Sequence, residues 1–186
     1  FYHDEKTTYL KQIRALRLSY EISLSSLSDI IIADEQCIQD TMTTQSQREL
    51  LSIECETISF SLQLLRNSYA ISAYHLWENA VCLWHNRRCP NEKTPAGWEV
   101  LKKFSQDIGY CPDKHLQIVK DITNILKHGS VTSANALLKE SERGQPGWQE
   151  ILTLDSSSEG NKYFPGNVSA VGIYFIFDAV ENSCPQ

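Results

Sequence analysis

The chain lacks the sequence signals of several common classes of protein. Its 186 residues contain no P-loop, no G-x-G-x-x-G turn and no G-x-S-x-G elbow, so the sequence predicts none of those nucleotide-binding or hydrolase sites. No apolar run reaches the roughly 20 residues of a membrane helix, and no basic-then-apolar leader opens the chain. We therefore expect neither a membrane segment nor a signal peptide. The formal net charge of -6 predicts that the molecule as a whole does not attract nucleic acid strongly.

Cysteine motifs are missing as well. The six cysteines are widely and irregularly spaced and form no C-x-x-C pair, so neither a zinc knuckle nor a redox motif is predicted. Cys37, Cys55 and Cys82 lie in apolar helical runs, where a free cysteine behaves as a small hydrophobe. Their even number leaves disulfides as the alternative, but the pattern favours reduced thiols and a cytoplasmic protein. We expect no cofactor and no bound metal.

Helical periodicity is what the sequence offers instead. The apolar content of 41% is ordinary for a single globular domain, here residues 1–186. Apolar residues recur at helical spacing over residues 5–33 and 47–87. Residues 34–46 between them are polar, and residues 41–44 are predicted to form a loop. The second segment contains neither glycine nor proline, and a helix of about 40 residues spans roughly 60 Å. That length predicts a bend, or an end that projects toward a partner.

Shorter helices are predicted after the long segment. Thr94 and Pro95 form a typical helix start, with threonine as the cap and proline at the first helical position. Gly129 is suited to a left-handed cap at the end of the next helix. Ser130 or Thr132 can then cap a further helix.

The C-terminal part is less regular. Residues 141–164 are polar and rich in helix breakers, which predicts a loop-rich insertion, with the state of residues 148–154 left open. Strand and helix both remain open for residues 168–180, and a helix capped by Asn167 is favoured. The sequence as a whole predicts an all-α bundle of four or five core helices. The predicted core comprises residues 5–140 and 165–182.

The end of the helix before Gly129 carries the clearest chemical pattern. Its apolar residues fall on one face, and the polar residues Thr123, Asn124, Lys127 and His128 occupy neighbouring angles. The order Thr123-Asn124-x-x-x-His128-Gly129 resembles the signature of the HEPN superfamily, the "higher eukaryotes and prokaryotes nucleotide-binding" helical domains. In that signature an arginine and a polar residue, often asparagine, precede a histidine that glycine frequently follows. Asn124, His128 and Gly129 match the signature, whereas Thr123 stands in the place of the arginine.

The resemblance implies an RNA-directed, homodimeric protein. In HEPN ribonucleases, arginine and histidine side chains of two protomers meet at the dimer interface and cleave RNA without a metal. A histidine can move the proton of a ribose 2'-hydroxyl, and a cation can hold the scissile phosphate. The resemblance thus implies a ribonuclease of the toxin or phage-defence type, with RNA or an antitoxin as partner. Because Thr123 supplies no cation, the alternative is a catalytically inactive HEPN-like module that binds a partner protein or a nucleotide. A third interpretation is a helical bundle unrelated to the superfamily.

A polar stripe on the long helix offers the missing groups. Arg66, Ser72, His75 and Glu78 interrupt an otherwise apolar pattern, and polar groups that face a core need partners. Arg66 can supply the cation if this helix packs near the motif. The predicted catalytic residues are His128, Asn124, Arg66 and His75, and the predicted substrate-binding residues are Lys127, Lys120, Thr123 and Glu78.

Structural explanations stand beside each of these interpretations. Lys127 and His128 can act as cations at a helix C-terminus, where they favour the negative end of the helix dipole. His75 and Glu78 can be a core histidine paired with a carboxylate, or half of a metal site in a helical bundle. An aromatic and basic cluster ends the long helix, where it can stack on bases or form the edge of the core: Trp77, Trp84, His85, Arg87 and Arg88.

Overall fold

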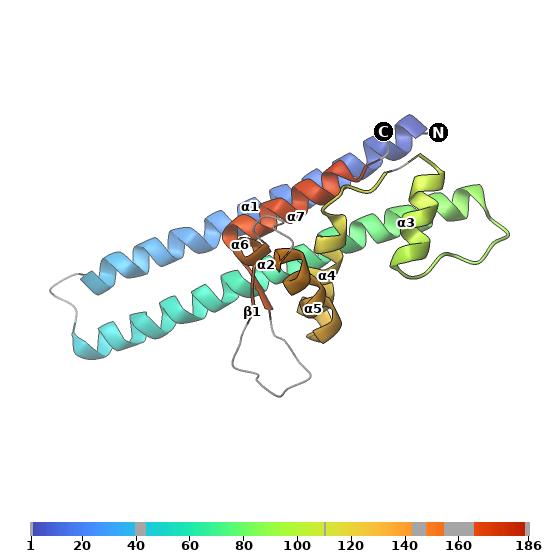
Figure 1. Cartoon of the computed structure of the whole chain (residues 1–186). Coiled ribbons are helices and arrows are strands. Elements are labelled where there is room, and N and C mark those ends of the chain that lie inside the picture. The colour runs from blue at the N-terminus through green and yellow to red at the C-terminus, as the bar shows by residue number, and fades with distance from the viewer. Residues whose placement is uncertain (1, 40–43, 110, 143–147, 155–165, 185–186) are drawn as a thin grey trace.

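The computed structural model describes residues 2–39, 44–109, 111–142, 148–154 and 166–184, and they are mostly helical (Figure 1). Their helices are α1 (Tyr2–Gln39), α2 (Gln45–Arg88), α3 (Trp98–Asp107), α4 (Leu116–His128), α5 (Val131–Glu142), α6 (Trp148–Ile151) and α7 (Ala170–Asn182), and their strands are β1 (Leu152–Leu154) and β2 (Gly166–Val168). The prediction of an all-α fold is confirmed. None of the helices in these ranges has an apolar stretch long enough to cross a bilayer.

Helices α1 and α2 form a long antiparallel hairpin (Figure 1). Thr44 starts α2 with a capping box, in which its hydroxyl accepts the Gln47 N–H and the Gln47 side chain accepts the Thr44 N–H. In the polar segment 34–46, the predicted end of the first helix at residue 33 is wrong, because residues 34–39 continue α1. A polar stretch without glycine or proline can continue a helix, so polarity alone did not predict the end of α1 correctly. Residues 40–43 of that segment lie outside the described residues.

The start of α3 differs from the prediction. The helix begins at Trp98, and its N-cap is Gly97 with a positive φ of 86°, a conformation that glycine adopts without strain. Thr94 does not cap it, because the Thr94 hydroxyl donates to the Asn86 side-chain oxygen at 2.9 Å. The end of α4 is as expected: Gly129 is left-handed, and its N–H donates to the Ile125 carbonyl at 2.8 Å.

The segments that were left open contain both kinds of structure. Residues 148–154 form α6 followed by β1, which pairs antiparallel with β2 in the register Leu152 with Val168 and Leu154 with Gly166. Helix is correct for most of residues 168–180, but the predicted Asn167 cap is wrong. Since Val168 is paired in β2, the helix starts later and Ser169 caps it by accepting the Gly172 N–H at 2.9 Å. Residues 143–147 and 155–165 of the predicted insertion lie outside the described residues.

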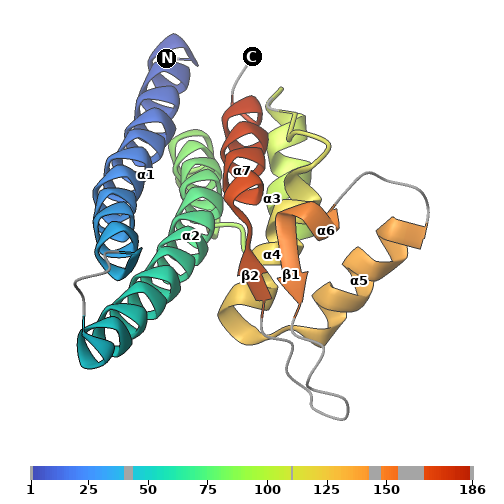
Figure 2. The ribbon, with the colours of Figure 1, turned by 90° about the vertical axis from the view of Figure 1, so that its left-hand side faces the viewer.

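The hydrophobic core lies where the hairpin meets the other helices. Figure 2 shows α7 between the α1–α2 hairpin and the group formed by α3, α4 and α6. Buried side chains from α1, α2, α4, α5 and α7 meet there, among them Tyr9, Trp77, Ile122 and Phe177. The other end of the hairpin, here called the hairpin arm (residues 25–39 and 45–64), extends beyond these helices (Figure 1).

Candidate functional site

The polar residues at the end of α4 separate into a buried and an exposed group. Thr123 is 1% exposed, and its hydroxyl donates to the Val119 carbonyl at 2.8 Å within the helix. Asn124 is half-buried, whereas Lys127 and His128 in the last turn are exposed. The threonine in the arginine position is thus part of the core, and the histidine faces solvent.

Arg66 is directed toward α1. Its guanidinium lies beside the Tyr20 hydroxyl; burial raises the pKa of Tyr20, and the nearby positive charge opposes that shift. The Arg66 Nε atom is buried without a hydrogen-bond partner. The Tyr20 ring packs against Tyr69 and Tyr174, with centroids 5.5 and 6.0 Å away. None of the hydrogen bonds and ion pairs among the described side chains joins Arg66 to His128.

A second polar group lies between α2 and α4. His75 Nδ1 is 2.8 Å from Glu78 Oε2, so the carboxylate can orient the imidazole. Burial raises the pKa of Tyr74, and the nearby Glu78 and Asp121 carboxylates raise it further. The Asp121 carboxylate also lies 3.0 Å from Lys120 Nζ. The buried Tyr74 hydroxyl therefore lies near both the Glu78 and the Asp121 carboxylates.

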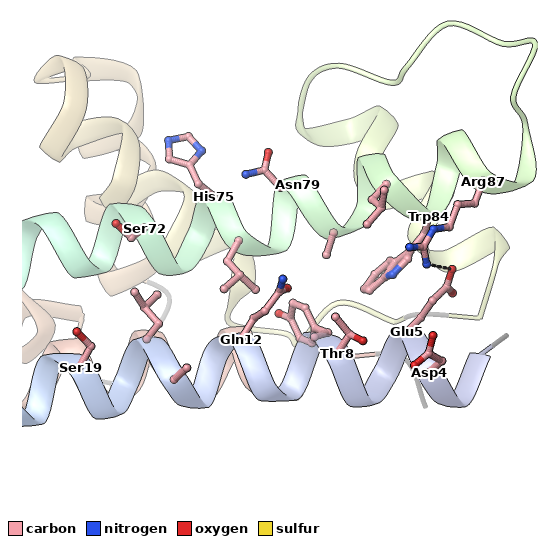
Figure 3. Close-up of a pocket in the computed structure, with 16 residues that line it drawn as sticks. Asp4, Glu5, Thr8, Gln12, Ser19, Ser72, His75, Asn79, Trp84 and Arg87 are labelled. Atoms are coloured by element: carbon pink, nitrogen blue, oxygen red, sulfur yellow. Dashed lines mark hydrogen bonds and ion pairs between the residues drawn. The ribbon is translucent and has the colours of Figure 1, made fainter.

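A groove of about 810 Å³ runs between α1 and α2 beside this group. Figure 3 shows that Gln12 reaches between the two helices, whereas His75 and Asn79 point away from α1 at the rim. At the far end of the groove, Arg87 is paired with Glu5 at 3.3 Å. The His75 imidazole at the rim, oriented by a carboxylate, can accept or donate a proton. The Arg87 guanidinium that lines the groove is instead paired with the buried Glu5 carboxylate.

The predicted residues therefore occupy separate places. The structure brings His75 together with Glu78, and it places Lys120 against Asp121 next to the same tyrosine. It does not bring Arg66 into contact with the end of α4. Thr123, in the arginine position of the motif, is buried in the core. Arg66, the predicted replacement cation, is directed toward α1.

Sequence reasoning missed two features. The first is a cluster of His85, Cys89 and Glu92, whose ligating atoms all lie within 4.8 Å of one another. Its signal is the spacing of four and then three residues across the end of a helix. The second is a stripe of exposed apolar residues along the hairpin arm. Its signal is the helical spacing of apolar residues in α2: Leu50, Ile53, Phe60 and Leu64.

Comparison with models of known protein families, with curated proteins and with solved structures finds no match to this chain.

Proposed function

We propose that this protein is a non-catalytic, HEPN-like helical module that acts by assembly, and that its hairpin arm pairs with a second copy of the chain. The observation that supports this most strongly is the exposed stripe of α2. Leu50, Ile53, Phe60 and Leu64 are each at least half exposed, although side chains of this kind are normally buried.

Helix α2 carries apolar residues on two faces within the arm. Leu62 is buried, and Leu51, Cys55 and Ile58 are half-buried, as expected for the face that packs on α1. The exposed stripe lies about 155° around the helix from that face at 100° per residue. A helix with a single solvent-exposed side needs only one apolar face, so the second face indicates a surface that is covered in the working protein.

The stripe has the symmetry of a two-fold interface. Relative to Thr57, the apolar residues stand at positions -7, -4, +3 and +7, and an antiparallel copy reverses these signs. Leu50 of one chain then faces Leu64 of the other, and the position opposite Ile53 lies one residue from Phe60. A closed homodimer requires such self-complementary surfaces, and this pattern is the reason for choosing a second copy as the occupant.

The polar residues within the stripe can be buried at little cost. The Thr57 hydroxyl donates to the Ile53 carbonyl at 2.8 Å, and the Ser61 hydroxyl donates to the Thr57 carbonyl at 2.9 Å. Since both hydroxyls already have acceptors within their own helix, removing water from the stripe leaves neither donor unpaired. A surface of this kind suits a protein partner better than a phosphate backbone, which needs cations.

The expected dimer is weak. From Leu50 to Leu64 the stripe is about 21 Å long at 1.5 Å per residue, so it offers less than the roughly 800 Å² per partner of a standard interface. We therefore expect a dissociation constant in the micromolar range, about -8 kcal/mol.

Sedimentation velocity of the full chain tests this proposal. The wild type should shift from monomer to dimer between about 1 and 100 µM, whereas Phe60→Glu should weaken association at least about tenfold because it places a charge in the interface. Ser59→Glu is the matched control, since it adds the same charge at an exposed site on another face of α2. A wild type that stays monomeric, or a Phe60→Glu variant that pairs as well as Ser59→Glu, would contradict the proposal.

A metal-independent ribonuclease of the toxin or phage-defence type is the second candidate. The exposure of Lys127 and His128 at the end of α4 favours it, because an accessible histidine next to a cation can reach an RNA backbone. Cleavage of total RNA in the presence of a chelator, lost in both His128→Ala and Arg66→Ala, would support the ribonuclease and contradict the non-catalytic module. An absence of cleavage at dimer-forming concentrations would support the module.

A further inference from the structure

The end of α2 and the turn after it bring three potential metal ligands together. His85 lies in the last turn of α2, Cys89 is the residue that ends the helix, and Glu92 follows in the turn. The Cys89 N–H donates to the His85 carbonyl at 2.8 Å, and the Glu92 N–H donates to the Cys89 carbonyl at 3.0 Å. These backbone hydrogen bonds fix the spacing of the three side chains.

The geometry is close to that of a bound ion. His85 Nε2 lies 3.7 Å from Glu92 Oε2, and the imidazole, thiol and carboxylate donor atoms lie within 4.8 Å of one another. A tetrahedral zinc site with bonds of 2.0–2.3 Å requires donor atoms about 3.3–3.7 Å apart. Glu92 has a side chain that is 69% exposed, so its rotation can close the remaining distance.

The imidazole is oriented with the right nitrogen toward the cluster. His85 Nδ1 faces the Asn86 side-chain oxygen at 3.4 Å, and that oxygen also accepts the Thr94 hydroxyl at 2.9 Å. Because an amide oxygen only accepts, the tautomer that donates to it has its proton on Nδ1 and leaves the Nε2 lone pair for the cluster. Metal-bound histidines are commonly oriented in this way by a hydrogen bond at the other nitrogen. The ring itself is held against the edge of Phe104, with centroids 4.8 Å apart.

The charges also suit a dication. A Cys89 thiolate and the Glu92 carboxylate would supply two negative charges, and the imidazole is a neutral ligand. The neighbouring Arg87 and Arg88 are directed to the buried Glu5 carboxylate, with distances of 3.3 and 2.7 Å. The basic end of the long helix therefore does not occupy the cluster.

From this arrangement we infer that His85, Cys89 and Glu92 form a binding site for a divalent transition metal ion of the zinc type. Sulfur, imidazole and carboxylate ligands together favour zinc or cobalt over magnesium and calcium, which prefer oxygen alone. A water molecule completes the fourth position. The ion joins the end of α2 to the connection that leads to α3, so its binding stabilises this corner of the fold.

Metal titration of the full chain tests this inference. The metal-free wild type should bind one equivalent of Zn²⁺ in competition with a chromophoric chelator, and Co²⁺ should produce a sulfur-to-metal absorption band. Cys89→Ser and Glu92→Gln should each weaken Zn²⁺ binding at least about tenfold, and Cys89→Ser should abolish the cobalt band. Glu92 is exposed, so its variant keeps the fold and isolates the loss of a ligand.

Cys111→Ser is the matched control, because Cys111 is an exposed cysteine outside the cluster. It should bind both metals like the wild type. Failure of the wild type to bind Zn²⁺, or binding by Cys89→Ser and Glu92→Gln as tight as that of Cys111→Ser, would overturn the inference.

Discussion

Gly172 lets α7 approach the end of α6 closely. A Cβ atom at this position would meet the Ile151 backbone, with the Ile151 Cα 2.8 Å away and the carbonyl oxygen closer still. That carbonyl also accepts the Ser169 N–H at 2.9 Å. The backbone contact therefore holds the start of α7, and no side chain larger than hydrogen fits there.

We predict that Gly172→Ala destabilises the protein by about 1–3 kcal/mol, the usual range for overpacking. On helix propensity alone the same change would stabilise the protein by roughly 1 kcal/mol. The sign of the measured change in stability therefore shows whether overpacking or helix propensity dominates. Urea denaturation followed by circular dichroism measures it. Val171→Ala, at an exposed position of the same helix, should stay within about 0.5 kcal/mol; a stabilised Gly172→Ala would contradict the close approach.

Glu5 is a buried carboxylate that connects the two ends of the hairpin. Its side chain is 3% exposed and lies 2.7 Å from the Arg88 guanidinium. Glu5→Gln should cost about 2–3 kcal/mol in urea denaturation, because it removes the negative charge that Arg87 and Arg88 share at this buried position. Asp4→Asn at the exposed neighbouring position should change little, and equal effects of the two variants would contradict a specific buried ion pair.

Buried tyrosines predict how stability depends on alkaline pH. Burial raises the pKa of Tyr9 well above its ordinary value, and burial likewise raises the pKa of Tyr74. Above pH about 10 the unfolded tyrosines release protons that the folded ones retain, so stability falls as pH rises, by about 1.4 kcal/mol per pH unit for each group. Below pH about 10 these tyrosines do not make the stability depend on pH.

Urea denaturation between neutral and alkaline pH measures this slope. Tyr9→Phe removes one of the groups and should make the alkaline slope shallower, even though the variant also loses the hydrogen bond to the Val180 carbonyl. A slope identical to that of the wild type would show that Tyr9 ionises as readily in the folded as in the unfolded chain.

At the level of elements, the start of α2 depends on its capping box. Thr44→Ala removes the hydroxyl that accepts the Gln47 N–H, and we expect a loss of about 1 kcal/mol of stability. Thermal or urea unfolding measures the loss. Ser46→Ala, in the first turn of the same helix, is the control and should have little effect; equal losses in the two variants would argue against the cap.

Periodicity predicted the helices well where the determinants are local. The long α2 followed from the absence of glycine and proline, and the end of α4 followed from Gly129. The start of α3 did not, because the Thr94 hydroxyl is occupied by Asn86, a residue of the preceding helix. The β1–β2 pair was missed because its partners are distant in sequence and only tertiary contact brings them together.

The candidate site shows the same limit. The spacing of polar residues in the sequence predicted which side chains share a helix face. It did not predict which neighbouring helix each face contacts. Arg66 turns toward Tyr20 of α1, and Thr123 bonds within its own helix. The His85, Cys89 and Glu92 cluster depends on the conformation of the turn after α2, which residue spacing alone does not determine.

At the scale of the whole molecule, the fold joins a packed body to a hairpin arm that extends beyond it (Figure 1). The body contains the core, the groove and the cluster at the end of α2. The arm carries an apolar face that the body does not cover. The central claim is that a second copy covers this face around a two-fold axis at Thr57.

Disulfide trapping at the proposed axis tests this claim most directly. Two copies of Thr57 should lie close enough for a disulfide, which requires Cα atoms about 4.4–6.8 Å apart. In a background in which the exposed Cys111 is replaced by serine, oxidised Thr57→Cys should give a covalent dimer on non-reducing gels. Ser59→Cys, about 160° around the helix from residue 57, should remain monomeric. The account is contradicted if Thr57→Cys does not cross-link, or if it cross-links no better than Ser59→Cys.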